Sequence, residues 1–153
     1  MDPTQQVDDQ FERQWFNYVL DTVVVGNAVQ QPAQMQILTD ADFEWWWLIG
    51  SRTSNLLKVL IKEAATGRDF IGTTASTVSG GGAFNGINFD LLCGTAAAVA
   101  AFPLAVPFVM PATRTYTILF SDTSGVNNTV ELVFSGFKLW QKPSTPSPTV
   151  STH

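Results

Sequence analysis

The chain has 153 residues, of which 45% are hydrophobic and only 14% are charged, and its net charge is −5. This length suits one domain with a sizeable core, and an acidic chain without a basic patch has no field that attracts nucleic acid or an anionic membrane. Typical soluble domains carry about 25% charged residues, so we expect part of this surface to be covered in an assembly.

Residues 1–14 are rich in Gln and Asp and lack a strand pattern, which predicts an extended N-terminal arm. Phe11 in this arm and Trp15 just after it are four residues apart, so a short helical turn would place both rings on one face. Such an arm can dock on a neighbouring subunit, which makes Phe11 and Trp15 candidate interface residues. From Trp15 to Val25, aromatic and β-branched residues predict the first strand.

The most distinctive segment is the strand predicted over residues 43–50, which contains three consecutive tryptophans. In a regular strand the side chains alternate, so Trp46 faces one side while Trp45 and Trp47 face the other. Either the strand is central and packed on both faces within one subunit, or another molecule covers part of it. Because large aromatic residues are enriched at protein interfaces, Trp45, Trp46 and Trp47 are candidate interface residues.

The other strand patterns are short and are separated by turn residues. They cover residues 35–38, 56–64, 87–91, 106–109, 115–120 and 129–140. Pro107 makes the fourth of these an edge strand, and Gly136 marks a β-bulge in the last. About eight strands without a long amphipathic helix predict an all-β fold, an eight-stranded jelly-roll-like antiparallel β-sandwich over residues 15–142. Residues 143–153 are Pro-, Ser- and Thr-rich and predict a flexible C-terminal tail.

Two uncharged stretches predict loops. Residues 72–86 are rich in Gly, Ser and Thr and predict a long surface loop. Residues 91–111 contain Pro103, Pro107 and Pro111, which would break a membrane-spanning helix. We therefore predict no membrane span there, but a buried loop and a short strand.

Residues that carry chemistry are scarce. The single histidine, His153, is the last residue of the tail, and the single cysteine, Cys93, follows an apolar stretch and predicts a buried, inert thiol in a strand. Asp40, Asp42 and Glu44 alternate and could together bind Ca²⁺, although a solvated turn before the tryptophan strand is the favoured interpretation. We therefore predict no catalytic set, no metal site and no cofactor, and hence not an enzyme.

A combination of strand and turn motifs in the second half of the chain resembles a known group of proteins. The motifs are Phe102-Pro103-Leu104, Pro111-Ala112, Thr123-Ser124-Gly125, Asn127-Asn128-Thr129 and Gly136-Phe137-Lys138-Leu139. They are similar to motifs of small virion proteins of tailed bacteriophages, a group that includes jelly-roll capsid cement, or decoration, proteins. The resemblance covers residues 85–140, with a weaker echo in residues 15–25.

This resemblance implies a structural role on the capsid exterior, where many copies bridge major capsid protein subunits and stabilise the head. We also expect a homo-oligomer, with a homodimer as the default because closed symmetric pairing is the commonest arrangement, and a trimer as the alternative. The acidic, polar N-terminus lacks the apolar core of a secretory signal, so we expect synthesis in the host cytoplasm.

A second function class stays open from the sequence alone, namely a glycan-binding head-fibre or tail appendage domain. Trp45 and Trp47 on one strand face would be ~6.5–7 Å apart and could stack on sugar rings. Exposed, coplanar rings would favour glycan binding, whereas rings covered by a protein neighbour would favour the interface.

Overall fold

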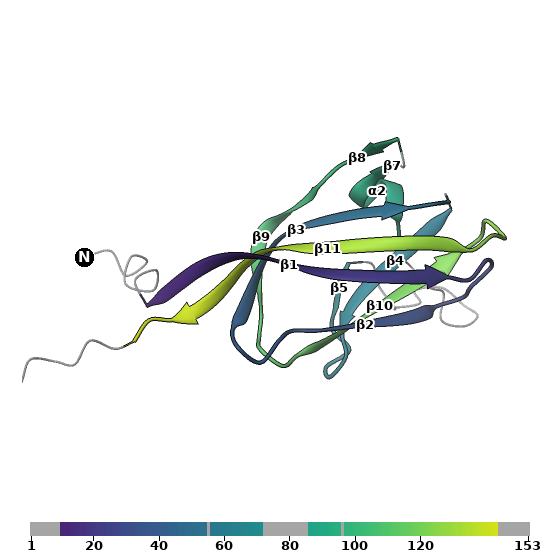
Figure 1. Ribbon diagram of the computed structural model, residues 1–153. Coiled ribbons are helices and arrows are strands. Elements are labelled where there is room, and N and C mark those ends of the chain that lie inside the picture. Colours follow the sequence, from purple (N-terminus) through teal and green to yellow (C-terminus); the bar gives the residue numbers. More distant parts are fainter. Residues whose placement is uncertain (1–9, 55, 72–85, 96, 144–153) are drawn as a thin grey trace, which may run out of the picture.

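The computed structural model describes residues 10–54, 56–71, 86–95 and 97–143. They form two antiparallel sheets with one short helix, which confirms the predicted all-β sandwich (Figure 1). Sheet A has the order β1 (Phe11–Val24), β11 (Asn128–Gln141), β3 (Asp42–Arg52), β9 (Phe102–Met110). Sheet B has the order β2 (Gln31–Gln36), β10 (Thr115–Asp122), β4 (Leu57–Glu63), β5 (Asp69–Ile71), and β6 (Ile87–Asn88) also pairs with β4. A small ribbon of β7 (Gly94–Thr95) and β8 (Ala98–Val99) follows the helix α2 (Phe89–Cys93).

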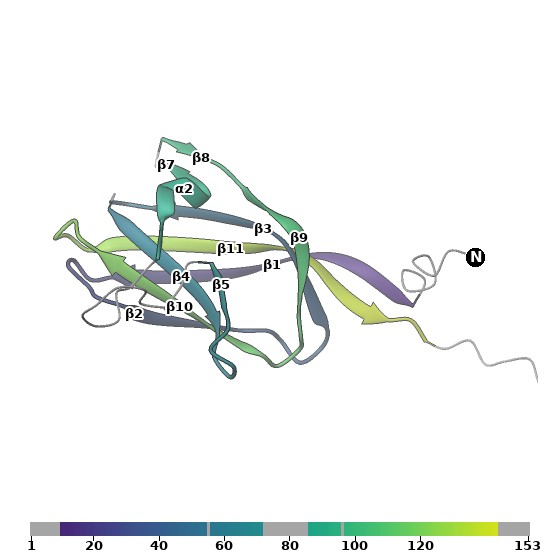
Figure 2. The ribbon, with the colours of Figure 1, turned by 180° about the vertical axis from the view of Figure 1, so that it is seen from behind.

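The strand pairing is nested along the chain. Strand β1 pairs with β11, β2 with β10, β3 with β9 and β4 with β5, all antiparallel. The first four strands alternate between sheets A and B, and the later strands β9, β10 and β11 return beside them with the same alternation. The two sheets lie one behind the other, sheet A nearer the viewer in Figure 1 and sheet B in Figure 2.

The core lies between the sheets and is built by the alternate side chains that each strand turns inward. Phe43, Leu48 and Phe134 from sheet A meet Val59, Ile118 and Phe120 from sheet B, and all six are fully buried. Burial of each such side chain contributes roughly 1.5–3 kcal/mol relative to exposure. The period-two pattern that predicts these strands is therefore the pattern that fills the core.

The N-terminal segment joins the sheet earlier than the sequence predicts. Strand β1 begins at Phe11, so residues 11–14 of the expected arm pair with β11 in sheet A and are not a helical turn. The pairing continues just past the strand, where the Lys142 N–H donates to the Gln10 carbonyl at 3.0 Å. The two strands extend together beyond the body of the sandwich (Figure 1). The predictions for residues 1–9, 72–85 and 144–153 fall outside the described part of the chain.

The strand predicted over residues 87–91 is wrong, because β6 ends at Asn88 and helix α2 follows. Asn88 caps the helix, since its side-chain oxygen accepts the Asp90 N–H at 3.0 Å. Phe89, Leu92 and Cys93 are buried at helical spacings of three and four residues. This periodicity is present in the sequence and competes with the period-two pattern. Strand β9 also differs, because it begins at Phe102 and is longer than the predicted edge strand.

Candidate protein-binding face

A β-bulge in strand β3 sets the directions of the three tryptophans. Ser135 and Gly136 are consecutive on β11, yet their partners on β3 are Trp47 and Trp45, so Trp46 is the extra residue. The bulge depends on Gly136, because a Cβ at this position would overlap the carbonyl oxygen of Glu44. The irregularity lies at Gly136 as predicted, but the extra residue is on β3 and not on the last strand, so it interrupts the regular alternation expected for the tryptophans.

Trp45 points into the core and is only 1% exposed. Its ring lies 5.0 Å from the ring of Phe134, and its Nε1–H donates to the Trp47 carbonyl at 2.8 Å. The prediction that Trp45 contacts a partner is therefore wrong. A sugar-binding platform of Trp45 and Trp47 is also wrong, because the two side chains do not share the outer face.

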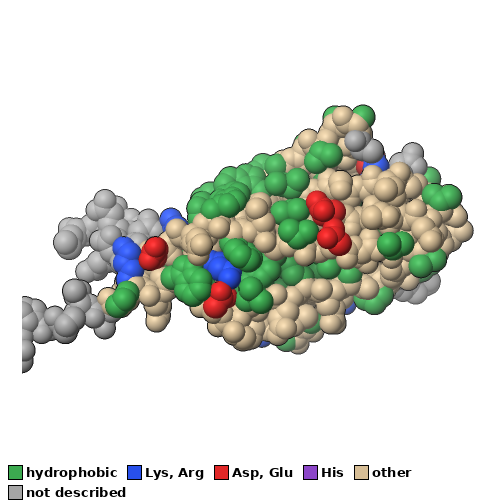
Figure 3. Space-filling model, viewed as in Figure 1, with side chains coloured by type: hydrophobic (Ala, Val, Ile, Leu, Met, Phe, Trp, Pro, Cys, Tyr) green, Lys and Arg blue, Asp and Glu red, His purple; other side chains and the backbone are tan. Residues whose placement is uncertain are grey.

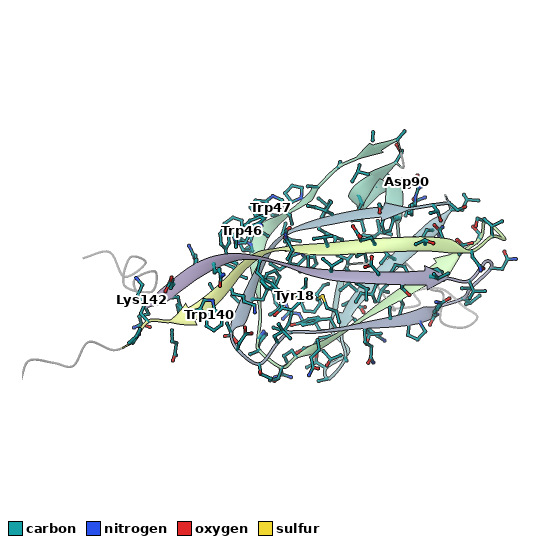
Figure 4. The ribbon with its side chains drawn as sticks, viewed as in Figure 1. Tyr18, Trp46, Trp47, Asp90, Trp140 and Lys142 are labelled. Atoms are coloured by element: carbon teal, nitrogen blue, oxygen red, sulfur yellow. The ribbon has the colours of Figure 1, made fainter. Side chains whose placement is uncertain are left out.

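Trp46 and Trp47 both contribute to an aromatic cluster on the outer face of sheet A, which also contains Trp15 and Phe137. The Trp46 and Trp47 rings are stacked with centroids 5.5 Å apart and an interplanar angle of 27°. Trp15 lies 5.5 Å from Trp47 and 5.2 Å from Phe137. Figure 4 shows Trp46 and Trp47 side by side near the point where β1 crosses β11. The structure thus brings together three of the predicted interface residues.

Sequence reasoning missed Phe137 and misplaced Phe11 relative to the others. Phe137 pairs directly with Trp15 across β1 and β11, which are more than a hundred residues apart, so no local pattern reveals the contact. Phe11 is half-buried at the start of β1, opposite Gln141, and makes no ring contact with the other described residues. It therefore lies outside the aromatic cluster.

The outer face around the cluster is largely apolar. Cross-strand register places Val19, Val133 and Ile49 in one row across β1, β11 and β3. Trp15 is 50% exposed and Val19 is 54% exposed. Figure 3 shows hydrophobic side chains gathered over this part of sheet A, with an acidic spot beside them. A contiguous apolar area of this kind is typical of a protein-binding surface.

One ion pair crosses the same face. Arg13 Nε lies 3.3 Å from Glu44 Oε2, and the Glu44 side chain is nearly buried among its neighbours. The indole N–H of Trp46 is also buried, and it has no hydrogen-bond partner among the described residues. A buried donor without an acceptor costs about 1–3 kcal/mol. The aromatic face therefore holds a buried donor that the described residues leave unsatisfied.

The three alternating carboxylates before and within β3 go to different partners. Asp40 accepts from Lys138 Nζ at 2.5 Å, Asp42 accepts the Ala112 N–H at 2.8 Å, and Glu44 pairs with Arg13. Hydrogen bonding to Lys138 holds the pKa of Asp40 below its usual value. In the described part of the chain, no three His, Cys, Asp or Glu side chains group closely enough to hold a metal ion.

Lys138 is a buried cation at the end of the core from which β1 and β11 extend beyond the sandwich. Its side chain is 5% exposed, and its ammonium lies 4.1 Å from the centroid of the Phe16 ring. Cys93 is buried as predicted, although in α2 and not in a strand, and burial raises the pKa of its thiol to about 12. Both groups face the protein interior, so neither offers chemistry to a ligand on the outer face.

No protein family model, curated protein or solved structure matches this chain. Among the described residues, no helix has the length and apolar character needed to cross a membrane.

Proposed function

We propose that this chain is a structural virion protein that binds other protein subunits through the outer face of sheet A. The observation that carries the proposal is the aromatic cluster of Trp15, Trp46, Trp47 and Phe137, which lies on an open sheet face outside the core. Tryptophan is among the residues that most often dominate binding energy at protein interfaces.

The sequence resemblance supplies the identity of the partner in this proposal. It implies that the partner is the major capsid protein and that the contact lies on the capsid exterior, where bound copies bridge neighbouring subunits. The nested pairing of β1 with β11, β2 with β10, β3 with β9 and β4 with β5 supports the jelly-roll assignment. Viral capsid proteins are among the classes that use this arrangement of two Greek keys.

The bridging mechanism needs only modest individual contacts. When copies of one protein are linked, the second contact forms at a high effective concentration, which can increase avidity ~10²–10⁴-fold. A cement protein of this kind therefore stabilises the head by joining subunits, without chemical catalysis.

The ring geometry favours a protein partner over a glycan. Trp46 and Trp47 stack on each other at 27°, Trp15 is tilted by 48° to Trp47, and Phe137 stands at 82° to Trp15. These rings interlock and do not form the coplanar platform that a sugar ring would cover. An uneven apolar surface of this kind suits side chains from another protein.

The test is binding of the purified full chain to expanded capsid shells assembled without it. We expect saturation at a fixed stoichiometry, and we expect Trp46→Ala to weaken binding at least ~30-fold, as for a hot-spot residue. Thermal unfolding of each variant separates lost binding from lost folding. Leu91→Ala is the matched control, because Leu91 is an exposed apolar residue on α2, away from the cluster, and should leave affinity unchanged.

Two results would overturn the proposal. If the purified chain does not bind the capsid shells, its partner is a different molecule. Glycan screening would then be the next experiment. A folded Trp46→Ala variant that binds as tightly as the wild type would move the binding surface away from the aromatic cluster.

A further inference from the structure

Strand β1 is an edge strand of sheet A, and in the described residues only β11 pairs with it. The direction of its backbone groups follows from one hydrogen bond, in which the Gln10 carbonyl accepts from Lys142 on the β11 side. The register of β1 with β11 is continuous, so the even-numbered residues direct their N–H and C=O groups to β11. The odd-numbered residues from Arg13 to Asp21 direct theirs to the other edge.

The far end of this edge is closed by a side chain. Gln31 Nε2 donates to the Val23 carbonyl at 2.7 Å, and Gln31 Oε1 accepts from the Val25 N–H at 2.9 Å. This side-chain amide occupies the position of a neighbouring strand, which also confirms that Val23 directs its carbonyl outward. The edge available for pairing therefore ends at Asp21, before Val23.

We propose that β1 pairs with β1 of a second copy of this chain, antiparallel, about a two-fold axis at Asn17. A two-fold axis places residues at equal distance from Asn17 opposite each other. Trp15 then faces Val19 of the partner subunit, and Arg13 faces Asp21 of the partner subunit. Every hydrogen-bonded pair joins odd-numbered residues, so the backbone groups that point outward meet each other.

Charge and side-chain type select this register. Moving the axis to Phe16 or Tyr18 keeps odd residues paired but places Arg13 opposite a valine in both cases. With the axis at Asn17, opposite charges meet twice, and the half-exposed Trp15 and Val19 form aromatic–β-branched pairs. Both kinds of cross-strand pair stabilise an antiparallel sheet. Arg13 also contacts Glu44, and a guanidinium has five N–H donors to share between carboxylates.

The single subunit contains a mismatch that this pairing relieves. Asp21 lies directly opposite Glu131 across β1 and β11, and both side chains are exposed on the outer face. Like charges opposite each other destabilise a sheet, and neither carboxylate has an ion-pair partner within the described residues. Arg13 of the partner subunit would bring a positive charge beside both carboxylates.

Self-pairing goes beyond the proposed function because it assigns the partner of an edge and not of the outer face. Two four-stranded sheets A would join into one sheet of eight strands. A two-fold axis perpendicular to the sheet keeps both outer faces on the same side. The dimer would therefore present two aromatic clusters on one continuous face, which is the linked arrangement that avidity requires.

The first test is the solution mass of the full chain with a Val19→Pro variant. Proline at Val19 removes an N–H that points away from β11 and places its ring in the path of a partner strand, and edge strands tolerate such prolines. We expect a wild-type dimer by light scattering at micromolar concentration and a folded Val19→Pro monomer. Val19→Thr keeps the N–H and the β-branched shape, so it should remain a dimer.

The second test addresses the register and does not depend on a proline. Asp21→Arg should weaken dimerisation at least tenfold. The new arginine would lie opposite Arg13 of the second copy, and the two-fold axis repeats this like-charge pair at the other end of the paired strands. The double variant Arg13→Asp with Asp21→Arg should restore most of the dimer. A wild-type monomer, a folded Val19→Pro dimer, or a double variant as weak as Asp21→Arg would each overturn the proposal.

These outcomes are separable from those of the shell-binding test. Trp46 is on β3, away from the β1 edge, so Trp46→Ala should still dimerise. A dimer that forms through β1 but ignores capsid shells would retain the self-pairing and reject the capsid function. A wild-type chain that is a monomer but still binds capsid shells would reject the self-pairing and retain the capsid function.

Discussion

At the residue scale, one glycine determines which tryptophans reach the surface. Because Gly136 has no side chain, the backbone of β3 can approach it closely. The carbonyl oxygen of Glu44 lies where a Cβ of residue 136 would be. The extra residue Trp46 then fits into β3, Trp45 turns inward, and Trp46 joins Trp47 outside. Which tryptophans reach the outer face thus depends on the absence of a Cβ at Gly136 on the neighbouring strand β11.

We predict that Gly136→Ala lowers the free energy of unfolding by about 2–3 kcal/mol, because the obstructing atom is backbone and cannot rotate away. Urea titration followed by tryptophan fluorescence measures this change, and near-ultraviolet circular dichroism should report altered packing of the aromatic cluster. Gly67→Ala is the control. Gly67 has a positive φ but nothing within 4 Å of an added Cβ, so only about 1 kcal/mol is lost there, with no aromatic change. Equal effects at both positions would show that the close approach is unimportant.

At the element scale, the sequence predicts the long strands because each alternates apolar and polar residues over one buried face. It fails where a second pattern overlaps. Residues 87–93 satisfy both a short strand and a capped helical turn, and the burial of Phe89, Leu92 and Cys93 against the core decides for the helix. The bulge is predicted at Gly136, yet its effect on Trp46 depends on which strand lies opposite. That pairing is non-local and has no signature within either strand.

Helix α2 is held to β3 by one buried charge. Arg52 donates through Nε and Nη2 to a single carboxylate oxygen of Asp90, and the Arg52 side chain is 5% exposed while that of Asp90 is 32% exposed. The two partners therefore differ in their access to water. A buried charge that loses its partner costs more than an accessible one.

We predict that Asp90→Ala is more destabilising than Arg52→Met, at about 2–3 kcal/mol against about 1 kcal/mol. In the first variant the guanidinium stays buried without its carboxylate, whereas in the second the carboxylate can turn to solvent and methionine fills the space. Urea unfolding of the two single variants and the double variant measures both costs and their coupling. If Arg52→Met proved the more harmful, the pair would act chiefly by packing of the arginine side chain.

At the scale of the whole molecule, hydrogen-bonded carboxylates close the sandwich at both ends. At one end Asp40 pairs with the buried Lys138. At the other end Asp122 accepts from Ser124 and from Asn128, whose amide also bonds to the Ser54 carbonyl. Burial alone would raise the pKa of Asp122, but these hydrogen bonds outweigh it and lower the pKa, as Lys138 does for Asp40.

Both pKa values therefore lie lower in the folded protein than the unfolded value near 3.8. The unfolded chain binds protons more readily, so the stabilisation is fully present above about pH 4 and is lost as the pH falls through the folded pKa values.

We predict that the free energy of unfolding declines below this pH and that Asp40→Asn makes the decline shallower. The amide cannot titrate, and it leaves Lys138 without its carboxylate at every pH, so the variant is also less stable at neutral pH. Urea titrations between pH 2 and 6 measure the slope. Glu12→Gln, on the exposed part of β1, should leave the slope unchanged, and an unchanged slope in Asp40→Asn would show that the buried lysine does not control acid stability.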